Sequence, residues 1–338
     1  IYRYWVPNTW KQGDYSTAIA LAAYADNEYS VKRTVRGWNL VNPTQNDYTS
    51  LTINELRKSE IYDNFEDYSN LSFMMMGSLT SSQLIAAYNK MRENKPLLNF
   101  LRRMMRTDND YYYELIGTLA LREENYDRAI HYLSQVSHKY QRTMNIFKCR
   151  YLTRKPFGHY QSRWTTYKSD YSDYVYDYEF SVIQHPYRSQ IDAKLKFAKQ
   201  MNAYKHDMQH GKNVDERGIA RIMYAIGRYN SFEECWALTQ YWRGSVWQLF
   251  NPNTYEDEEF GEKNYAFLYD YKKTVGHENT EEIYNREIEL ALNMMETDGA
   301  RAEAHYILGN LKTIVKLYGN TSTAQFVKSS CDNWETWI

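Results

Sequence analysis

The sequence predicts an all-α fold, an irregular α-solenoid built from helical hairpins. Glycine (14) and proline (6) are scarce among the 338 residues, whereas a sandwich or barrel needs a turn about every 8–12 residues. Apolar residues recur at helical spacing in many segments of the chain. Small residues stand where neighbouring helices would have to touch.

The clearest element is the hairpin at 111–140, with the sequence YYYELIGTLALREENYDRAIHYLSQVSHKY. Gly117 lies in the middle of its first helix, where glycine costs roughly 1 kcal/mol relative to alanine. A second helix passing very close would account for this glycine, and Ala129 would offer the matching small surface. The turn is expected at 123–125. The apolar face of the first helix consists of Tyr112, Leu115, Ile116 and Leu119.

Further helices follow from the same pattern. The segment 12–25 matches the second half of the hairpin, with Ala18 in the place of Ala129. Thr80 is placed to cap a helix at 80–93, and Pro96 to open one at 96–105. A last hairpin at 302–327 has Gly309 in the helix-contact place of Gly117. The remaining helices are predicted at 189–208, 213–231, 231–244 and 281–297.

Three stretches lack helical periodicity: 26–50, 154–187 and 250–264. The second holds two prolines and a tyrosine cluster, so it is the predicted boundary between domains. The expected organisation is an N-terminal helical-repeat block (1–153), a Tyr-rich irregular connector (154–187) and a C-terminal helical-repeat block (188–338).

The charge balance argues against a nucleic-acid-binding protein, because 41 basic and 42 acidic residues leave a net charge of −1. Cys149, Cys235 and Cys331 form no CxxC or Cys/His ligand spacing, so neither a zinc site nor a disulfide framework is predicted. No apolar run approaches the roughly 18 residues of a membrane span. The chain begins at Ile1 without methionine, so we expect a processed or truncated product, from which any signal peptide or lipid-attachment cysteine would have been lost.

Tyrosine is unusually abundant. The 34 tyrosines bring the aromatic content to 16%, although the mean hydropathy is −0.76. A tyrosine combines an apolar ring with a polar tip, so it suits both helix–helix seams and binding surfaces. Both interpretations stay open for the aromatic residues outside clear helices. The candidate interaction surface consists of Tyr241, Trp242, Trp247, Tyr171, Tyr174 and Tyr176.

We predict no pair of histidine or carboxylate ligands at i and i+4 on one helix face, as in HExxH, and we find no glycine-rich phosphate loop or GxSxG elbow. His131 and His138 are seven residues apart on one predicted helix, either as a solvated face or as a ligand pair. A carboxylate cluster lies at 170–179. It would suit a cation, an acid pair for sugar hydrolysis or an exposed loop. We predict no catalytic residue, no metal site and no cofactor.

The hairpin resembles the tetratricopeptide repeat, which places an aromatic, a Leu-Gly pair, an alanine and a bulky residue at fixed positions. Tyr113, Ile116–Gly117, Ala129 and Leu133 take these places, whereas Ala120 replaces an expected aromatic. The resemblance implies a right-handed solenoid with a broad concave surface.

A second resemblance concerns the segment LYGNTSTAQFV (317–327). It is similar to the Tyr-Pro-Asn-Ser/Thr turn of tetratricopeptide proteins in the Gram-negative envelope, with Gly319 in place of the proline. The whole pattern also resembles uncharacterised envelope proteins and lipoproteins of gut-type Gram-negative anaerobes. These likenesses imply a periplasmic or outer-membrane-associated protein.

The leading functional hypothesis is a non-enzymatic helical-repeat scaffold that binds a protein or peptide partner in the bacterial envelope. One alternative is a surface glycan-binding protein, because exposed aromatic rings suit sugars as well as protein side chains. Another is a glycoside-active enzyme that uses the carboxylates at 170–179.

Overall fold

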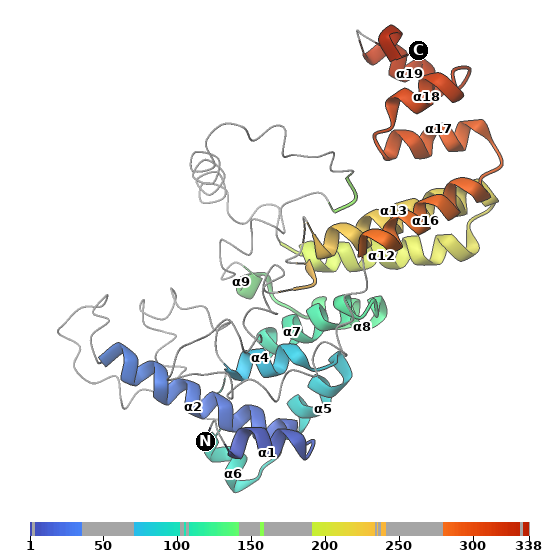
Figure 1. Cartoon of the computed structure of the whole chain (residues 1–338). Coiled ribbons are helices and arrows are strands. Elements are labelled where there is room, and N and C mark those ends of the chain that lie inside the picture. Colours follow the sequence, from blue (N-terminus) through green and yellow to red (C-terminus); the bar gives the residue numbers. More distant parts are fainter. Residues whose placement is uncertain are drawn as a thin grey trace. The chain divides into compact units, whose positions relative to one another are not determined.

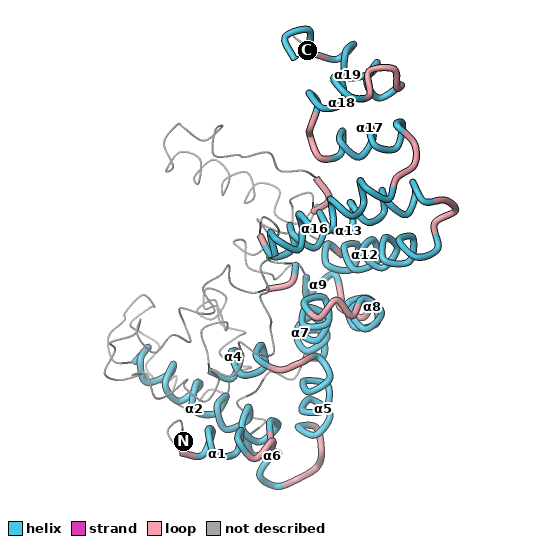
Figure 2. The backbone as a smooth tube through the Cα atoms, turned by 45° about the vertical axis from the view of Figure 1, so that its right-hand side comes forward, coloured by secondary structure: helices cyan, strands magenta, loops and turns pink. Residues whose placement is uncertain are grey.

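The computed structural model describes residues 1, 4–35, 71–101, 105, 108–141, 156–158, 191–233, 235, 238–240, 280–331 and 334–337. Within these ranges all regular elements are helices joined by turns, so the fold is all-α (Figure 1, Figure 2). The described residues form two compact units, one up to residue 141 and one from residue 156 onward. The right-handed solenoid and the division into blocks at 153 and 187 stay predictions.

In the first unit, α2 contacts four other helices, α5 packs on α7, and α7 packs on α8. The helices are α1 (Trp5–Lys11), α2 (Tyr15–Val35), α4 (Leu71–Ser78), α5 (Ser81–Met91), α6 (Pro96–Leu101), α7 (Asn109–Arg122), α8 (Tyr126–Leu133) and α9 (His138–Gln141). The four helices around α2 are α1, α4, α5 and α6. The prediction of a loop at 26–50 is wrong for its first part, because residues 26–35 continue α2. Neither glycine nor proline interrupts the chain between Gly13 and Gly37.

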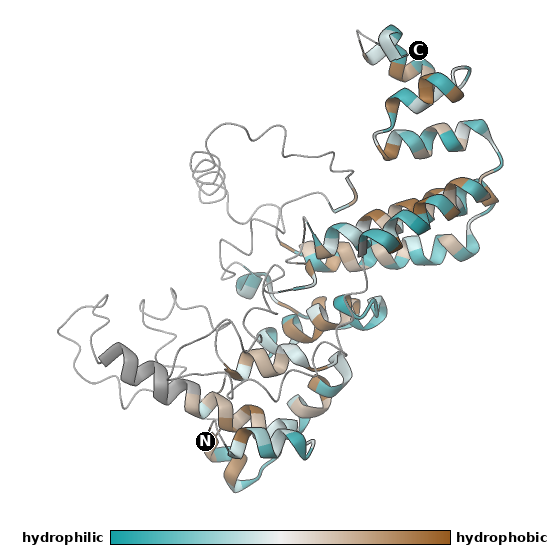
Figure 3. Ribbon diagram, in the orientation of Figure 1, coloured by the Kyte–Doolittle hydropathy of each residue, from teal (hydrophilic) through white to brown (hydrophobic). Residues whose placement is uncertain are grey.

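The core of this unit lies between helices that turn apolar residues toward one another. Brown hydrophobic segments are prominent on α2, α5 and α7 (Figure 3). The helix α4 is buried along its whole length. A helix without a solvent-facing side is expected to be mostly apolar all round rather than amphipathic, and α4 carries three methionines, a leucine and a phenylalanine. The largest fully buried side chains are Ile19, Phe73, Met75, Leu84, Leu115, Ile116 and Leu119.

Several helix ends lie where the sequence predicts them. Thr80 caps α5 in a capping box: its hydroxyl accepts from the Gln83 backbone N–H, and the Gln83 side chain accepts from the Thr80 N–H. Pro96 opens α6. In the hairpin, α7 ends at a C-cap on Glu123, and Asn125 caps α8 by accepting from the Arg128 N–H. These predictions are confirmed.

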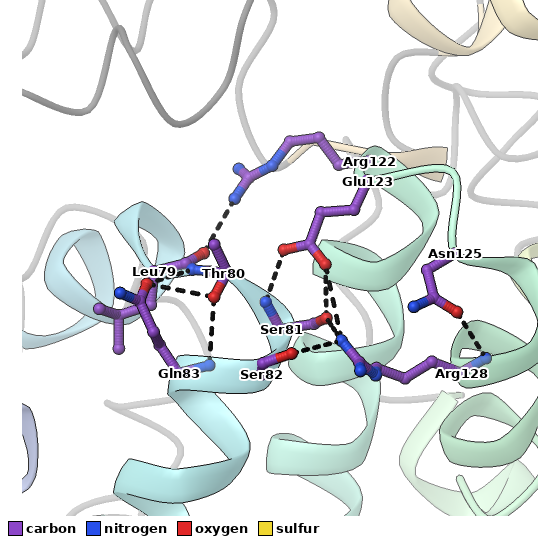
Figure 4. A network of polar contacts seen from close by, with 9 residues as sticks. All are labelled: Leu79, Thr80, Ser81, Ser82, Gln83, Arg122, Glu123, Asn125 and Arg128. Carbon is purple, nitrogen blue, oxygen red and sulfur yellow. Dashed lines mark hydrogen bonds and ion pairs between the residues drawn. The ribbon is translucent and has the colours of Figure 1, made fainter.

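A polar network ties the α7–α8 turn to the start of α5 (Figure 4). The Glu123 carboxylate accepts from the Ser81 backbone N–H at 2.6 Å and from the Ser81 hydroxyl at 2.5 Å. Arg128 donates to the hydroxyls of Ser81 and Ser82, each at 2.7 Å. Arg122 donates to the Gly77 carbonyl at the end of α4. The N-terminal N–H groups of a helix lack acceptors within that helix. Here the Glu123 carboxylate, from the α7–α8 hairpin, is the acceptor for the first N–H of α5.

Asp14, immediately before α2, links that helix to α5. Its Oδ1 accepts from the Ser16 hydroxyl at 2.8 Å and from Lys90 Nζ at 3.0 Å. Burial raises the pKa of Asp14, but the hydrogen bonds from Ser16, Thr17 and Lys90 outweigh it and lower the pKa to about 2.

Asp14 should therefore make folding stability pH-dependent in acid. Since its pKa is lower in the folded than in the unfolded chain, the stabilisation is present above about pH 4 and lost as the pH falls toward 2. About one third of this side chain is exposed, so we expect only about 1 kcal/mol after solvent screening. Urea unfolding at pH 7 and pH 3 measures it. Asp14→Asn should lower stability at pH 7 and reduce the difference between the two pH values; an unchanged difference would contradict this assignment.

In the second unit, α13 lies between α12 and α16 and also contacts α17 (Figure 2). The helices are α12 (Ala193–His210), α13 (Val214–Phe232), α16 (Thr280–Met294), α17 (Asp298–Ile307), α18 (Leu311–Leu317) and α19 (Ser322–Ser330), followed by a 3-10 turn at Trp334–Trp337. The hairpin predicted at 302–327 is wrong in detail, because this region contains parts of three helices. Asn310 and Thr321 lie at the N-caps of α18 and α19.

The break predicted at Asn230–Ser231 lies slightly later in the structure, because α13 continues to Phe232 and ends at a C-cap on Glu233. Ser231 donates to the Arg228 carbonyl within the helix, and the buried Asn230 amide donates to the carbonyls of Pro156 and Gly158. These polar side chains are satisfied inside the unit, so they do not end the helix.

Two glycines let the neighbours of α13 approach closely. A Cβ atom at Gly218 would lie 2.8 Å from Met295 Cε. A Cβ at Gly227 would lie 2.5 Å from the Phe157 ring and 2.6 Å from Met201 Sδ. This unit therefore uses glycine at helix contacts, as the sequence predicts for Gly117.

The start of α13 is bonded to the start of α17. Asp215 accepts from the Thr297 hydroxyl at 2.6 Å and from the Glu296 N–H at 2.7 Å. The Thr297 hydroxyl and the Glu296 N–H lower the pKa of Asp215. Thr297 itself caps α17, so this link fixes the position from which the C-terminal helices begin.

Candidate functional site

An exposed pair of aromatic rings joins α17 to α19. Tyr306 and Phe326 have centroids 5.9 Å apart and planes at 77°, an edge-to-face contact. Tyr306 is 45% exposed and Phe326 is 55% exposed. A single exposed apolar side chain is ordinary on a protein surface. Two rings from different helices that contact each other in this way form an ordered apolar surface.

The packing of the C-terminal helices shows why these rings face outward. Beneath them, α17 and α19 share a cluster with α18. Small residues at the contact, Ala302 and Ala324, let the helices lie close, so the larger rings are left at the outer edge. The buried members of this cluster are Ala302, Ile314, Val315, Ala324 and Val327.

The residue next to Tyr306 adds to this packing. His305 stacks on Tyr318, with ring centroids 5.7 Å apart and planes at 27°. Burial lowers the pKa of His305, which favours the neutral ring at physiological pH. This contact joins α17 to the turn before α19 and supports the backbone that carries Tyr306.

Polar residues border the pair on both helices. Glu303 precedes Tyr306 by one helical turn, and Gln325 and Ser329 flank Phe326; all three are exposed. An apolar centre with a polar rim is the usual composition of a protein-binding surface. Chemically, the arrangement can hold an apolar or aromatic side chain of a partner against the two rings.

In the first unit, tyrosines mainly fill helix seams. Tyr88 of α5 stacks on Tyr112 of α7 with centroids 4.4 Å apart, and both are buried. Tyr113 of α7 contacts Tyr132 of α8 at 5.8 Å. Burial raises the pKa of Tyr88, while Arg92, which donates to its hydroxyl at 2.8 Å, acts in the opposite direction. Here the seam-filling interpretation of the tyrosines applies.

The four residues predicted at helix contacts do not share one role. Gly117 lies in α7 against α8, where a Cβ atom would be 2.5 Å from Leu133 Cγ. Ala129 and Ala18 are fully buried. Gly309 differs from its predicted place, because it follows the end of α17 with φ of 73°. This left-handed conformation suits glycine, so Gly309 ends a helix rather than contacting one.

The remaining predicted residues divide into two groups. His131 ends up near the end of α8, and His138 begins α9, so the prediction that they share one helix is wrong: the chain turns at Ser134–Ser137. The candidate aromatic surface, Tyr241, Trp242, Trp247, Tyr171, Tyr174 and Tyr176, lies outside the described residues, as do the carboxylates at 170–179.

Sequence reasoning missed the Tyr306–Phe326 pair. In the sequence, Phe326 belongs to the segment 317–327 that resembles a repeat turn. No periodicity relates it to Tyr306, twenty positions earlier. It also missed His206 and His210, whose i, i+4 spacing on α12 is a signal that the sequence does contain.

No described helix combines the length and the apolarity that a membrane span requires. Comparison with protein-family models, with curated proteins and with solved structures found no match to this chain.

Proposed function

We propose that this protein is a non-enzymatic, tetratricopeptide-like scaffold that binds a protein or peptide partner in the bacterial envelope. The observation that carries the proposal is the exposed Tyr306–Phe326 contact at the junction of α17 and α19. The few residues that carry most of the binding energy at an interface are enriched in tyrosine and tryptophan, and phenylalanine is also enriched at interfaces. The envelope assignment is supported by the resemblance of residues 317–327 to a turn of envelope tetratricopeptide proteins.

The helical hairpins support the proposal as well. The buried alanines Ala302 of α17 and Ala324 of α19 let these two helices pack closely in the same cluster. A binding surface that is rigid before the partner arrives loses little conformational entropy on binding. The aromatic pair is therefore presented by a firm support rather than by a loop.

The partner can be sought by affinity capture from an envelope extract, followed by identification of the captured protein and measurement of its affinity for purified variants. Replacing Tyr306 or Phe326 by serine should weaken binding about tenfold or more, since each removes an aromatic anchor. Leu290→Ser is the matched control, because Leu290 is a 44% exposed apolar residue on α16 of the same unit. Equal affinities for all three variants and the wild type would refute the proposed site.

A further inference from the structure

Two histidines lie one helical turn apart at the end of α12. The rings of His206 and His210 stack, with centroids 4.4 Å apart and planes at 23°. Both side chains are exposed; the fraction is 67% for His206. The sequence HDMQH gives them the i, i+4 spacing of the two zinc-binding histidines in HExxH helices. The prediction that no such i, i+4 pair of ligands exists on one helix is therefore wrong.

The hydrogen bonds of these histidines select the form that binds metal. His210 Nδ1 lies 3.0 Å from the His206 backbone carbonyl. A carbonyl oxygen can only accept, so Nδ1 of His210 carries the proton and Nε2 has a free lone pair in the neutral ring. His206 Nδ1 lies 3.3 Å from Asp207 Oδ1, and an ionised carboxylate imposes the same tautomer. Metal-binding histidines are usually oriented by such a bond to a carboxylate or carbonyl.

The two rings lie close enough to share one ion after they turn. Two nitrogen ligands at about 2.0–2.1 Å from a tetrahedral ion are roughly 3.4 Å apart. Because the rings are stacked with centroids 4.4 Å apart, their planes must rotate out of stacking for both Nε2 lone pairs to meet at one ion. His210 also lies in the last turn of α12, where the helix dipole favours positive charge.

We propose that His206 and His210 bind one divalent transition-metal ion of the Zn²⁺, Cu²⁺ and Ni²⁺ class through their Nε2 atoms. Imidazole is a preferred ligand for these metals. No group of three or more potential ligand side chains occurs in the described part of the chain, so water completes the coordination and the site is open. Asp207 is a positioning residue that orients the His206 ring.

The test is calorimetric titration of the untagged full-length chain with ZnCl2. The wild type should bind one ion per chain at this site. His206→Ala and His210→Ala should each weaken this binding about tenfold or more, because either change converts a chelate into a single-ligand contact. His131→Ala, which removes an exposed histidine from α8, should leave it unchanged. MgCl2 should give no comparable binding, since Mg²⁺ prefers oxygen ligands.

A second readout separates chelation from loss of structure. Zn²⁺ should raise the Tm of the wild type and of His131→Ala more than that of either α12 variant, while circular dichroism confirms that all variants fold. Wild-type Zn²⁺ affinity in both α12 variants would overturn the proposal. So would a stoichiometry of one ion per two chains with an ion-dependent dimer, because the site would then lie between molecules.

Discussion

Replacing Gly117 by valine is expected to destabilise the protein by about 3 kcal/mol, and alanine by about 1–2 kcal/mol. The Cβ atom of either residue would lie 2.5 Å from Leu133 Cγ and 2.6 Å from its Cδ2. Because Cγ is the branch point of the leucine, the whole side chain of Leu133 or the α8 backbone would have to move. Valine adds two methyl groups to a contact that already has no room for one. Urea denaturation followed by circular dichroism gives the change in unfolding free energy.

The chain provides a matched control at Gly77. This residue is also buried in a helix, α4, but a Cβ atom there would have no neighbour within 4 Å. Gly77→Ala should therefore be neutral or stabilising by up to about 1 kcal/mol, as helix propensity predicts. A destabilisation as large as that of Gly117→Ala would show that loss of glycine, and not close helix contact, is responsible.

A double-mutant cycle identifies the contact itself. In a Leu133→Ala background the obstructing Cγ and Cδ atoms are gone, so Gly117→Ala should cost less than about 0.5 kcal/mol. The coupling between the two positions should then be at least about 0.5 kcal/mol, in the range found for residues in contact. Additive effects would mean that α7 and α8 do not meet at this pair.

Glu123→Ala is expected to cost about 2–3 kcal/mol. Glu123 lies at the surface, but only 24% of its side chain is exposed, and its carboxylate accepts two short hydrogen bonds from Ser81. Hydrogen bonds to a charged group contribute about 1.5–3 kcal/mol. The substitution also leaves the first N–H of α5 without this partner and removes the negative charge 3.9 Å from Arg128. The same urea titrations measure the loss.

Glu93 supplies the comparison for Glu123. It pairs with Lys95 at 2.6 Å, but about half of each side chain is exposed. Exposed ion pairs contribute about 0.2–1 kcal/mol, so Glu93→Ala should have a small effect. Glu123→Gln should fall between the two, because the amide oxygen still accepts but the charge is lost. If Glu93→Ala proved as destabilising as Glu123→Ala, the network around Ser81 would not be the reason.

Local features of the sequence were enough to predict many helix ends. Thr80 with Gln83, and Pro96, carry their capping role within three or four residues, so no tertiary information is needed. The close contact at Gly117 was also predictable, because glycine is unfavourable inside a helix unless a neighbour leaves no room for a side chain. Gly218 and Gly227 lie inside the helical pattern of α13 in the same way, so the same signal is present there.

Features that depend on tertiary contacts were not predictable in this way. Glu123 and Ser81 are 42 positions apart, and no periodicity links them. Asn230 is a residue type typical of turns, yet its amide is satisfied by a distant backbone. Gly309 and Gly117 both follow a large apolar residue in the sequence. Only the structure shows that Gly309 lies beyond the end of α17, where it ends the helix, whereas Gly117 lies inside α7, where it contacts α8. Exposure of Tyr306 and Phe326 likewise depends on which face of each helix is covered.

Small residues pack the helices of this chain, and we propose that an exposed aromatic pair is left for recognition of a partner. Photocrosslinking in living cells can capture that partner, with the photoreactive amino acid p-benzoylphenylalanine placed at 326 or, as the comparison, at 290. We expect a covalent adduct with one specific polypeptide from position 326, and none from position 290. If position 326 gave no adduct, or both positions gave the same adducts, the pair would not be a recognition site.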